Sequence, residues 1–202
     1  NILVDGNYHL PLLKTISAVL GLLNVPSAKN GELLAQLQEF FVQRVKNMMG
    51  DQGIRYDVID AILNEKANDD IVDLFVRAKA LAEYVETSEA AESIQAFTRV
   101  VNLCKKAEGE TIINESLFVE PAEKELYEVV CRLQKETIPA LVAYNYADVL
   151  KLINEVSAPV NKFFDTVMVM DKDENVKNNR LALLVQVKET ASMVGDLSAI
   201  VL

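Results

Sequence analysis

Histidine and tryptophan are nearly missing from this chain of 202 residues, which has no tryptophan and a single histidine, His9. Histidine-rich zinc sites, HExxH metallopeptidases and di-iron bundles built on Glu-x-x-His pairs all need more than one histidine. A Ser-His-Asp triad would have to use His9. The sequence also lacks a G-x-S-x-G motif, a Walker loop and a G-x-G-x-x-G motif. We therefore expect any catalytic chemistry to lie outside this chain.

Glycine and proline are scarce as well, with 7 and 5 residues, while 50% of the chain is hydrophobic and 25% is charged. This composition excludes disordered and collagen-like chains and favours an all-α protein. No apolar run reaches the roughly 18–20 residues that a membrane helix needs. The first residues do not resemble a signal peptide, and the missing initial methionine leads us to expect a fragment of a longer protein. We expect a cytoplasmic location.

The two cysteines, Cys104 and Cys131, lie within helical patterns and have apolar neighbours. We interpret them as buried, reduced thiols of a cytosolic protein. A disulfide or a nucleophilic thiol is the alternative.

The charge is strongly acidic, with 20 basic against 30 acidic residues and a net charge of -10. Such a chain does not hold nucleic acid by bulk charge, so any nucleic-acid site must be local. Two segments contain basic residues and no acid. They are 93–107, with Arg99, Lys105 and Lys106, and 175–188, with Lys177, Asn178, Asn179, Arg180 and Lys188. Arginine and asparagine can position phosphates or read base edges, although ordinary solvated helix faces have the same composition.

Apolar residues recur with the helical period of about 3.6 along nearly the whole sequence. The pattern predicts about eight helices and no convincing strand. The predicted helices cover 10–23, 32–49, 56–63, a helix ending near 85, another ending near 107, 121–144, 146–156 with a continuation through 163–167, and 174–201. The longest loop is expected over 108–119.

Polar residues and prolines predict where several of these helices begin and end. Asn68 or Asp69 is the expected cap of the fourth helix, and Thr87 or Ser88 is expected to open the fifth.

Three later helices have their own signals. We expect Pro139 to kink the helix over 121–144 and Asn145 to cap the next one. Pro159 is expected to separate that helix from its continuation.

Asp69, Asp70 and Asp73 form a D-D-x-x-D pattern. In helical prenyl-diphosphate enzymes such carboxylates hold Mg²⁺ against a diphosphate. Those enzymes need a second carboxylate cluster, which this sequence lacks. We therefore favour acidic residues in the first turn of a helix, where the helix dipole stabilises them.

Several long motifs in the sequence are specific to one family, and they occur in that family's order. The motifs are DQGIRYDVIDAIL at 51–63, RVVNL at 99–103, EPAE at 120–123, YADVL at 146–150, FFDTVMVM at 163–170 and NRLALL at 179–184. Together they closely resemble the C-terminal part of the bacterial glycyl-tRNA synthetase beta subunit. The resemblance spans essentially the whole chain.

The resemblance implies a helical body-tail-like region over 1–66 and a DALR-type anticodon-binding helical bundle over 67–202. The letters that name this bundle read Asp148-Val149-Leu150-Lys151 here, with alanine replaced by valine and arginine by lysine. In the family, the alpha subunit carries the aminoacylation site and uses ATP, Mg²⁺ and glycine, and the beta subunit recognises tRNA. The implied partners are a tRNA for glycine, the alpha subunit and the remainder of the beta subunit, with no membrane. No catalytic residue, metal ligand or cofactor is expected in this chain itself.

Residue by residue, the resemblance points to Arg99 and Asn102 in an R-V-x-N motif and to Asn179 and Arg180 in an N-R-L motif. With the neighbouring lysines, the candidate tRNA-binding residues are Arg99, Asn102, Lys105, Lys106, Lys177, Asn179 and Arg180. The alternatives are that Arg180 pairs with Asp165 or Asp171 inside the bundle, and that Asn102 caps or bridges helices.

Phe163 and Phe164 could stack on RNA bases, although their helical spacing beside valines is more typical of core residues. We therefore expect a tRNA recognition module that supports glycine attachment by the alpha subunit. The alternative is a scaffold that docks onto the remainder of the synthetase and has no tRNA binding of its own.

Overall fold

The computed structural model describes residues 2–23, 27–64, 69–107 and 112–202, and helices dominate all four segments. The α-helices are α1 (Ile2–Asp5), α2 (Leu12–Leu22), α3 (Ser27–Asp51), α4 (Tyr56–Leu63), α5 (Ile71–Val85), α6 (Ala90–Cys104), α7 (Pro121–Glu136), α8 (Ile138–Val142), α9 (Tyr146–Asn154), α10 (Ser157–Thr166) and α11 (Glu174–Ser192). Two short 3₁₀ helices, η1 (Glu115–Leu117) and η2 (Leu197–Ala199), complete the set. Within these residues β pairing is limited to an isolated bridge between Pro11 and Asp70. The predicted all-α fold is confirmed.

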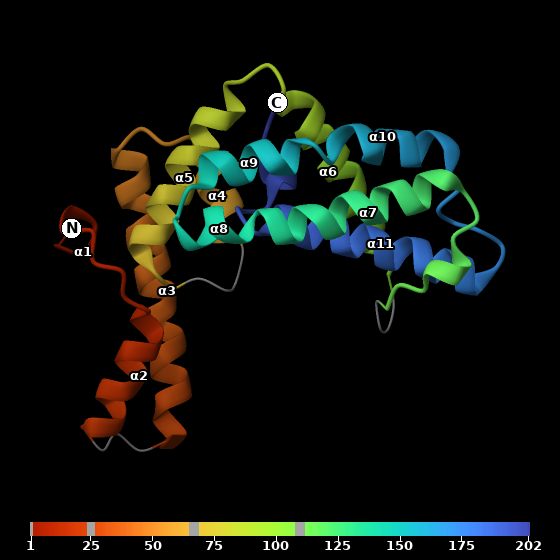
Figure 1. Cartoon of the computed structure of the whole chain (residues 1–202). Coiled ribbons are helices and arrows are strands. Elements are labelled where there is room, and N and C mark those ends of the chain that lie inside the picture. The colour runs from red at the N-terminus through yellow and green to blue at the C-terminus, as the bar shows by residue number, and fades with distance from the viewer. Residues whose placement is uncertain (1, 24–26, 65–68, 108–111) are drawn as a thin grey trace.

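The helices from α5 onward form a bundle, and α11 lies at its centre. Helix α11 packs against both α6 and α7, while α10 packs on α7 and α9 on α5. Figure 1 shows α7, α10 and α11 side by side, with the α2–α3 hairpin extending away from them. Consecutive residues 179–184 of α11 are all buried, as expected of a helix surrounded by neighbours. The core therefore forms around this last long helix.

Several helix boundaries differ from the predictions for physical reasons. Helix α5 is capped by Asp70, whose carboxylate accepts hydrogen bonds from the N–H groups of Val72 and Asp73. Asp69, predicted for this role, instead caps α2, and Asn68 lies outside the described residues. Helix α6 begins at Ala90, beyond Thr87 and Ser88.

The three later signals have mixed outcomes. The predicted cap Asn145 is confirmed, because its side chain accepts a hydrogen bond from the N–H of Asp148. The predicted helix over 121–144 is divided at Thr137 into α7 and α8, with Pro139 in the first turn of α8. The division predicted at Pro159 is present but lies slightly earlier, because α9 ends at Asn154 and α10 begins at Ser157. Pro159 lies in the first turn of α10, where its missing N–H has no intrahelical partner to lose. The last predicted helix ends at Ser192 rather than at 201.

Core packing extends across the predicted division between 1–66 and 67–202. Val45 and Met49 of α3 and most of α4 belong to the same hydrophobic cluster as the later helices. The backbone N–H of Asp196 also donates to the carbonyl oxygen of Ala61 at 2.8 Å. These contacts hold α4 against the C-terminal segment. The division into two regions stays a prediction.

Cys104 and Cys131 are free thiols and only partly buried. Burial raises the pKa of the Cys104 thiol to about 11, so this group stays protonated at neutral pH and is a poor nucleophile. Of the helices described, none is both long and apolar enough to cross a membrane.

Candidate nucleic-acid interface

Helix α6 and the turn that follows it expose four of the predicted residues. Its inner face is set by Ile94, Phe97 and Val100, which are fully buried against the bundle. The helical period then directs Arg99 and Asn102 to solvent, and Lys105 and Lys106 follow directly after the helix. Val101 and Cys104 are only half-buried, so the predicted burial of the Cys104 thiol is met in part.

Arg99 lies over an aromatic ring. Its guanidinium carbon is 4.3 Å from the centroid of the Phe164 ring on α10, within the range of a cation–π interaction. Phe163, by contrast, is fully buried, so its predicted core role is confirmed. Phe164 is half-buried and packs against the core from its edge.

Asn102 and Lys105 are joined one helical turn further on. The Lys105 ammonium donates a hydrogen bond of 2.9 Å to the side-chain oxygen of Asn102. Both residues and Lys106 are exposed. The face therefore presents cationic and amide donors, the groups that bind phosphate oxygens and base acceptors.

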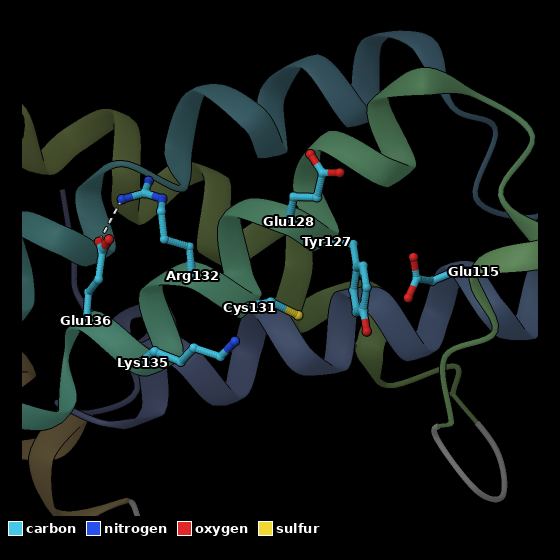
Figure 2. Close-up of a pocket in the computed structure, with 7 residues that line it drawn as sticks. All are labelled: Glu115, Tyr127, Glu128, Cys131, Arg132, Lys135 and Glu136. Carbon is cyan, nitrogen blue, oxygen red and sulfur yellow. Dashed lines mark hydrogen bonds and ion pairs between the residues drawn. The ribbon is translucent and has the colours of Figure 1, made fainter.

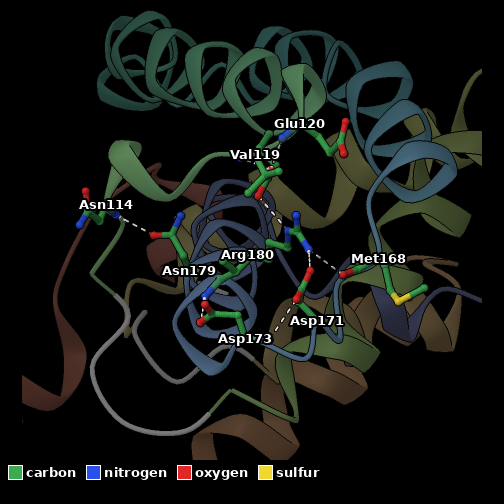
Figure 3. Close-up of polar contacts among 10 residues, drawn as sticks. Asn114, Val119, Glu120, Met168, Asp171, Asp173, Asn179 and Arg180 are labelled. Carbon is green, nitrogen blue, oxygen red and sulfur yellow. Dashed lines mark hydrogen bonds and ion pairs between the residues drawn. The ribbon is translucent and has the colours of Figure 1, made fainter.

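Arg180 is the centre of a buried polar network, shown in Figure 3. Its side chain is 4% exposed and forms ion pairs with Glu123 at 2.9 Å and with Asp171 at 2.7 Å. It also donates to the carbonyl oxygen of Met168 at 2.9 Å. Burial alone would lower the pKa of Arg180, but the bonds from Glu123 and Asp171 outweigh it and raise that pKa. The alternative role for Arg180, a pairing inside the bundle, is confirmed with Asp171 as the partner rather than Asp165.

The other two candidates on α11 are also engaged within the fold. Asn179 is 3% exposed, and its side-chain oxygen accepts a hydrogen bond of 2.7 Å from the N–H of Asn114. Lys177 is half-buried and pairs with Glu174 at 2.5 Å. Because α11 turns Asn179 and Arg180 inward, we correct their assignment from RNA contacts to structural residues. The structure thus leaves the α6 residues as the exposed part of the predicted set.

The three aspartates of the D-D-x-x-D pattern serve local structure. Asp69 accepts hydrogen bonds from the N–H groups of Leu13 and Lys14, and Asp70 caps α5 and contacts His9 at 2.9 Å. Asp73 forms a buried ion pair with Arg77 at 2.7 Å. The favoured interpretation, acidic residues at the start of a helix, is therefore confirmed for Asp70 at the cap and Asp73 in the first turn of α5. Across the part of the chain that the structure describes, no cluster of three or more histidine, cysteine or acidic side chains could hold a metal ion.

A groove of about 410 Å³ runs along the outer face of α7, and the sequence did not indicate it (Figure 2). Its lining residues are Glu115, Tyr127, Glu128, Cys131, Arg132, Lys135 and Glu136. Arg132 is already paired with Glu136 and Glu155, each at 2.7 Å. With three acidic residues in its lining, this groove is less suited to a phosphate backbone than the α6 face.

Comparison with known proteins identifies the family to which this arrangement belongs. Residues 93–197 match the DALR anticodon binding domain, so the match includes all of the exposed α6 candidates. The chain belongs to the DALR anticodon-binding domain family. In this DALR domain, Val149 and Leu150 are buried, while Lys151 pairs on the surface with Asp148 at 2.9 Å.

The family resemblance seen in the sequence is also confirmed by similar proteins. The chain is 44% identical to the glycine–tRNA ligase beta subunit of Clostridioides difficile over 170 residues, which are 84% of this chain and 24% of that protein. It is 38% identical to the beta subunit of Desulforamulus reducens over 204 residues, which are 100% of this chain and 29% of that protein. With the beta subunit of Shewanella pealeana the identity is 36%, over 98% of this chain and 29% of that protein. The chain therefore spans less than a third of the length of these relatives.

Proposed function

We propose that this chain is a tRNA recognition module of a glycine–tRNA ligase beta subunit and that the exposed face of α6 binds the anticodon stem-loop of a glycine tRNA. The observation that carries the proposal is the grouping of Arg99, Asn102, Lys105 and Lys106 on one exposed face within the matched DALR region. We define these four residues as the α6 face.

Recognition would combine phosphate and base contacts. The bases of an anticodon loop are unpaired, so polar side chains can reach their Watson–Crick edges. Lysine and arginine contacts to phosphates fix the register of the RNA on the protein. The net charge of -10 limits attraction elsewhere on the surface, which favours a local site over nonspecific RNA binding.

The proposed module supports catalysis without performing it. Holding the anticodon arm would place the acceptor end of the tRNA at the site of the alpha subunit, which is an effect of proximity and orientation. ATP, Mg²⁺ and glycine would bind at that subunit, in the cytoplasm, and none of them is assigned to residues of this chain.

Fluorescence-anisotropy titration tests the proposal. The chain is titrated onto a glycine tRNA and onto the same tRNA with a swapped anticodon, at two salt concentrations. We expect tighter binding to the natural anticodon and weaker binding at the higher salt concentration. Reversing two charges with Lys105→Glu and Lys106→Glu should weaken binding to both tRNAs. The slope of log K against log salt concentration should become shallower by about one unit per lost phosphate contact.

A matched control reverses two exposed lysines elsewhere, Lys79→Glu on α5 and Lys135→Glu on α7. This variant has the same net charge as the α6 variant. Equal losses in both variants, or equal affinity of the wild type for the two tRNAs, would contradict anticodon reading by the α6 face.

The second candidate function is a docking scaffold, and the α2–α3 hairpin favours it. Leu22, Leu23 and Phe40 are 82%, 69% and 58% exposed. Beside the hairpin, a groove of about 240 Å³ is lined almost entirely by apolar residues of α1, α2, α3 and α5. Exposed apolar surface of this kind marks an interaction site. Because the chain covers less than a third of the relatives' length, the proposed occupant is the remainder of the same polypeptide.

Hydrogen exchange measured on the full-length beta subunit and on this chain tests the docking role. We expect the amides of α2 and α3 to exchange more slowly in the full-length protein, because covered helices open less often. The amides of α7 and α11 serve as the internal reference, since their core is complete within this chain. Equal exchange of the hairpin in both proteins, or dimerisation of this chain through the hairpin, would contradict docking onto the remainder of the subunit.

A further inference from the structure

The pair of Arg99 and Phe164 has a geometry that phosphate binding alone does not require. The Phe164 ring meets the ring of the fully buried Phe163 edge to face, with centroids 5.7 Å apart and an interplanar angle of 71°. Phe164 also packs against the core, so the bundle holds its orientation. The guanidinium of Arg99 rests over this ring and is itself exposed.

A guanidinium held in this way is ordered before any ligand binds. Arginine is planar and weakly hydrated, so it stacks on aromatic faces and presents its N–H groups at its edges. Among the residues that the structure describes, the acidic side chains in ion pairs are joined to cations other than Arg99. Order before binding reduces the entropy that a ligand contact costs.

The neighbouring turn supplies a complementary donor. The oxygen of the Asn102 side chain accepts the hydrogen bond from Lys105, so its NH₂ group is the part of the amide suited to an outside acceptor. Arg99 and Asn102 are three residues apart on one helix and lie on neighbouring turns of the same face. A flat, ordered cation therefore stands beside an amide donor, which is the combination that an unpaired base can use.

We propose that Arg99, backed by Phe164, is a stacking platform for one unpaired base of an RNA loop, with Asn102 donating to an acceptor on the edge of that base. The inference rests on the proposed function, because it assigns the base contact within the α6 face. Bases in a duplex stem are stacked on one another and offer no free face, so the ligand class is a single-stranded loop.

The test uses fluorescent hairpins with the anticodon stem-loop of a glycine tRNA, each with one abasic position in the loop. For the wild-type chain we expect one position at which loss of the base weakens binding by between about 5-fold and 150-fold, the range of a stacked base. Arg99→Lys keeps the charge but removes the plane, and Phe164→Leu removes the ring but keeps an apolar side chain. Both variants should bind the intact hairpin more weakly and lose the dependence on that position.

Two controls separate the possible outcomes. Phe118→Leu changes another half-buried phenylalanine, which meets Tyr127 of α7 rather than Arg99, and should leave the dependence on the abasic position unchanged. Lys106→Glu removes a charge that is not bonded to Asn102, and it should weaken binding to every hairpin while leaving the dependence on the abasic position unchanged. A second outcome is that the wild type binds while Arg99→Lys and Phe164→Leu still lose affinity at the same abasic position. In that case the stacking platform is refuted and the proposed function stands. If the wild type binds no hairpin and no tRNA, both are refuted.

Discussion

At the scale of single residues, Arg99 and Arg180 have the same side chain and opposite surroundings. Arg99 faces solvent over an aromatic ring, while Arg180 is enclosed with two carboxylates. The carboxylate of Glu123 is fully buried, and its second oxygen accepts hydrogen bonds from the N–H groups of Val119 and Glu120 at 2.8 and 2.7 Å. Glu123 thus joins the start of α7 to Arg180 on α11, and Arg180 in turn bonds to Met168 and Asp171 in the loop after α10.

Removing this buried charge should destabilise the fold strongly. Glu123→Gln keeps the shape of the side chain but leaves Arg180 with only one carboxylate partner. Because removing one partner of a buried, hydrogen-bonded ion pair is costly, we expect a loss of about 3 kcal/mol in the free energy of unfolding, measured by urea denaturation. Arg132→Gln is the control, since Arg132 forms only exposed ion pairs and should cost about 1 kcal/mol or less. Similar losses in the two variants would contradict the assigned role of Glu123.

At the scale of helices, the sequence predicted which elements exist better than it predicted which residues they expose. The apolar period located α4 at 56–63 with both bounds correct, because that helix has a single buried face. Pro159 indicated the division between α9 and α10 but not its position, because a proline is tolerated in the first turn of a helix and the break lies before it. The start of a helix depends on which of two neighbouring polar residues caps it, and tertiary contacts decide this: Asp70 caps α5 because Asp69 bonds to the start of α2.

For the candidate site, too, the sequence identified the helices but not all of the side chains that they expose. The α6 candidates are exposed because the inward neighbours of Arg99 and Asn102 are apolar at the helical period. Asn179 and Arg180 were misassigned because their partners, Asn114 and Glu123, are more than 50 residues away in the sequence. A signal was available: the apolar run over 181–184 leaves α11 without a polar face at that point, which is typical of a central helix. A polar residue next to such a run is more often enclosed with a partner than exposed.

At the scale of the whole molecule, a buried carboxylate connects α4 to the C-terminal segment. Asp57 accepts two hydrogen bonds from the Arg55 guanidinium and one of 2.8 Å from the N–H of Val201. The Arg55 side chain also donates to the carbonyl oxygen of Val201 at 2.7 Å. Burial alone would raise the pKa of Asp57, but the bonds from Arg55, Val201 and Val58 outweigh it and lower that pKa.

This connection makes a defined prediction for the pH dependence of stability. Because the folded pKa of Asp57 lies below its unfolded value of about 3.9, its stabilisation is complete at neutral pH and is lost as the pH falls through the folded pKa. Asp57→Asn should therefore lower the free energy of unfolding by about 2 kcal/mol at pH 7, and the gap from the wild type should narrow below about pH 4. Urea unfolding of both proteins at pH 7, 4 and 3 measures this difference in the free energy of unfolding.

The control is Asp60→Asn on the same helix, which removes only an exposed pair with Lys46. Its free energy of unfolding should stay within about 1 kcal/mol of the wild-type value at every pH. If the difference in the free energy of unfolding between Asp57→Asn and the wild type stays constant down to pH 3, the Asp57 carboxylate does not provide the connection between α4 and the C-terminal segment.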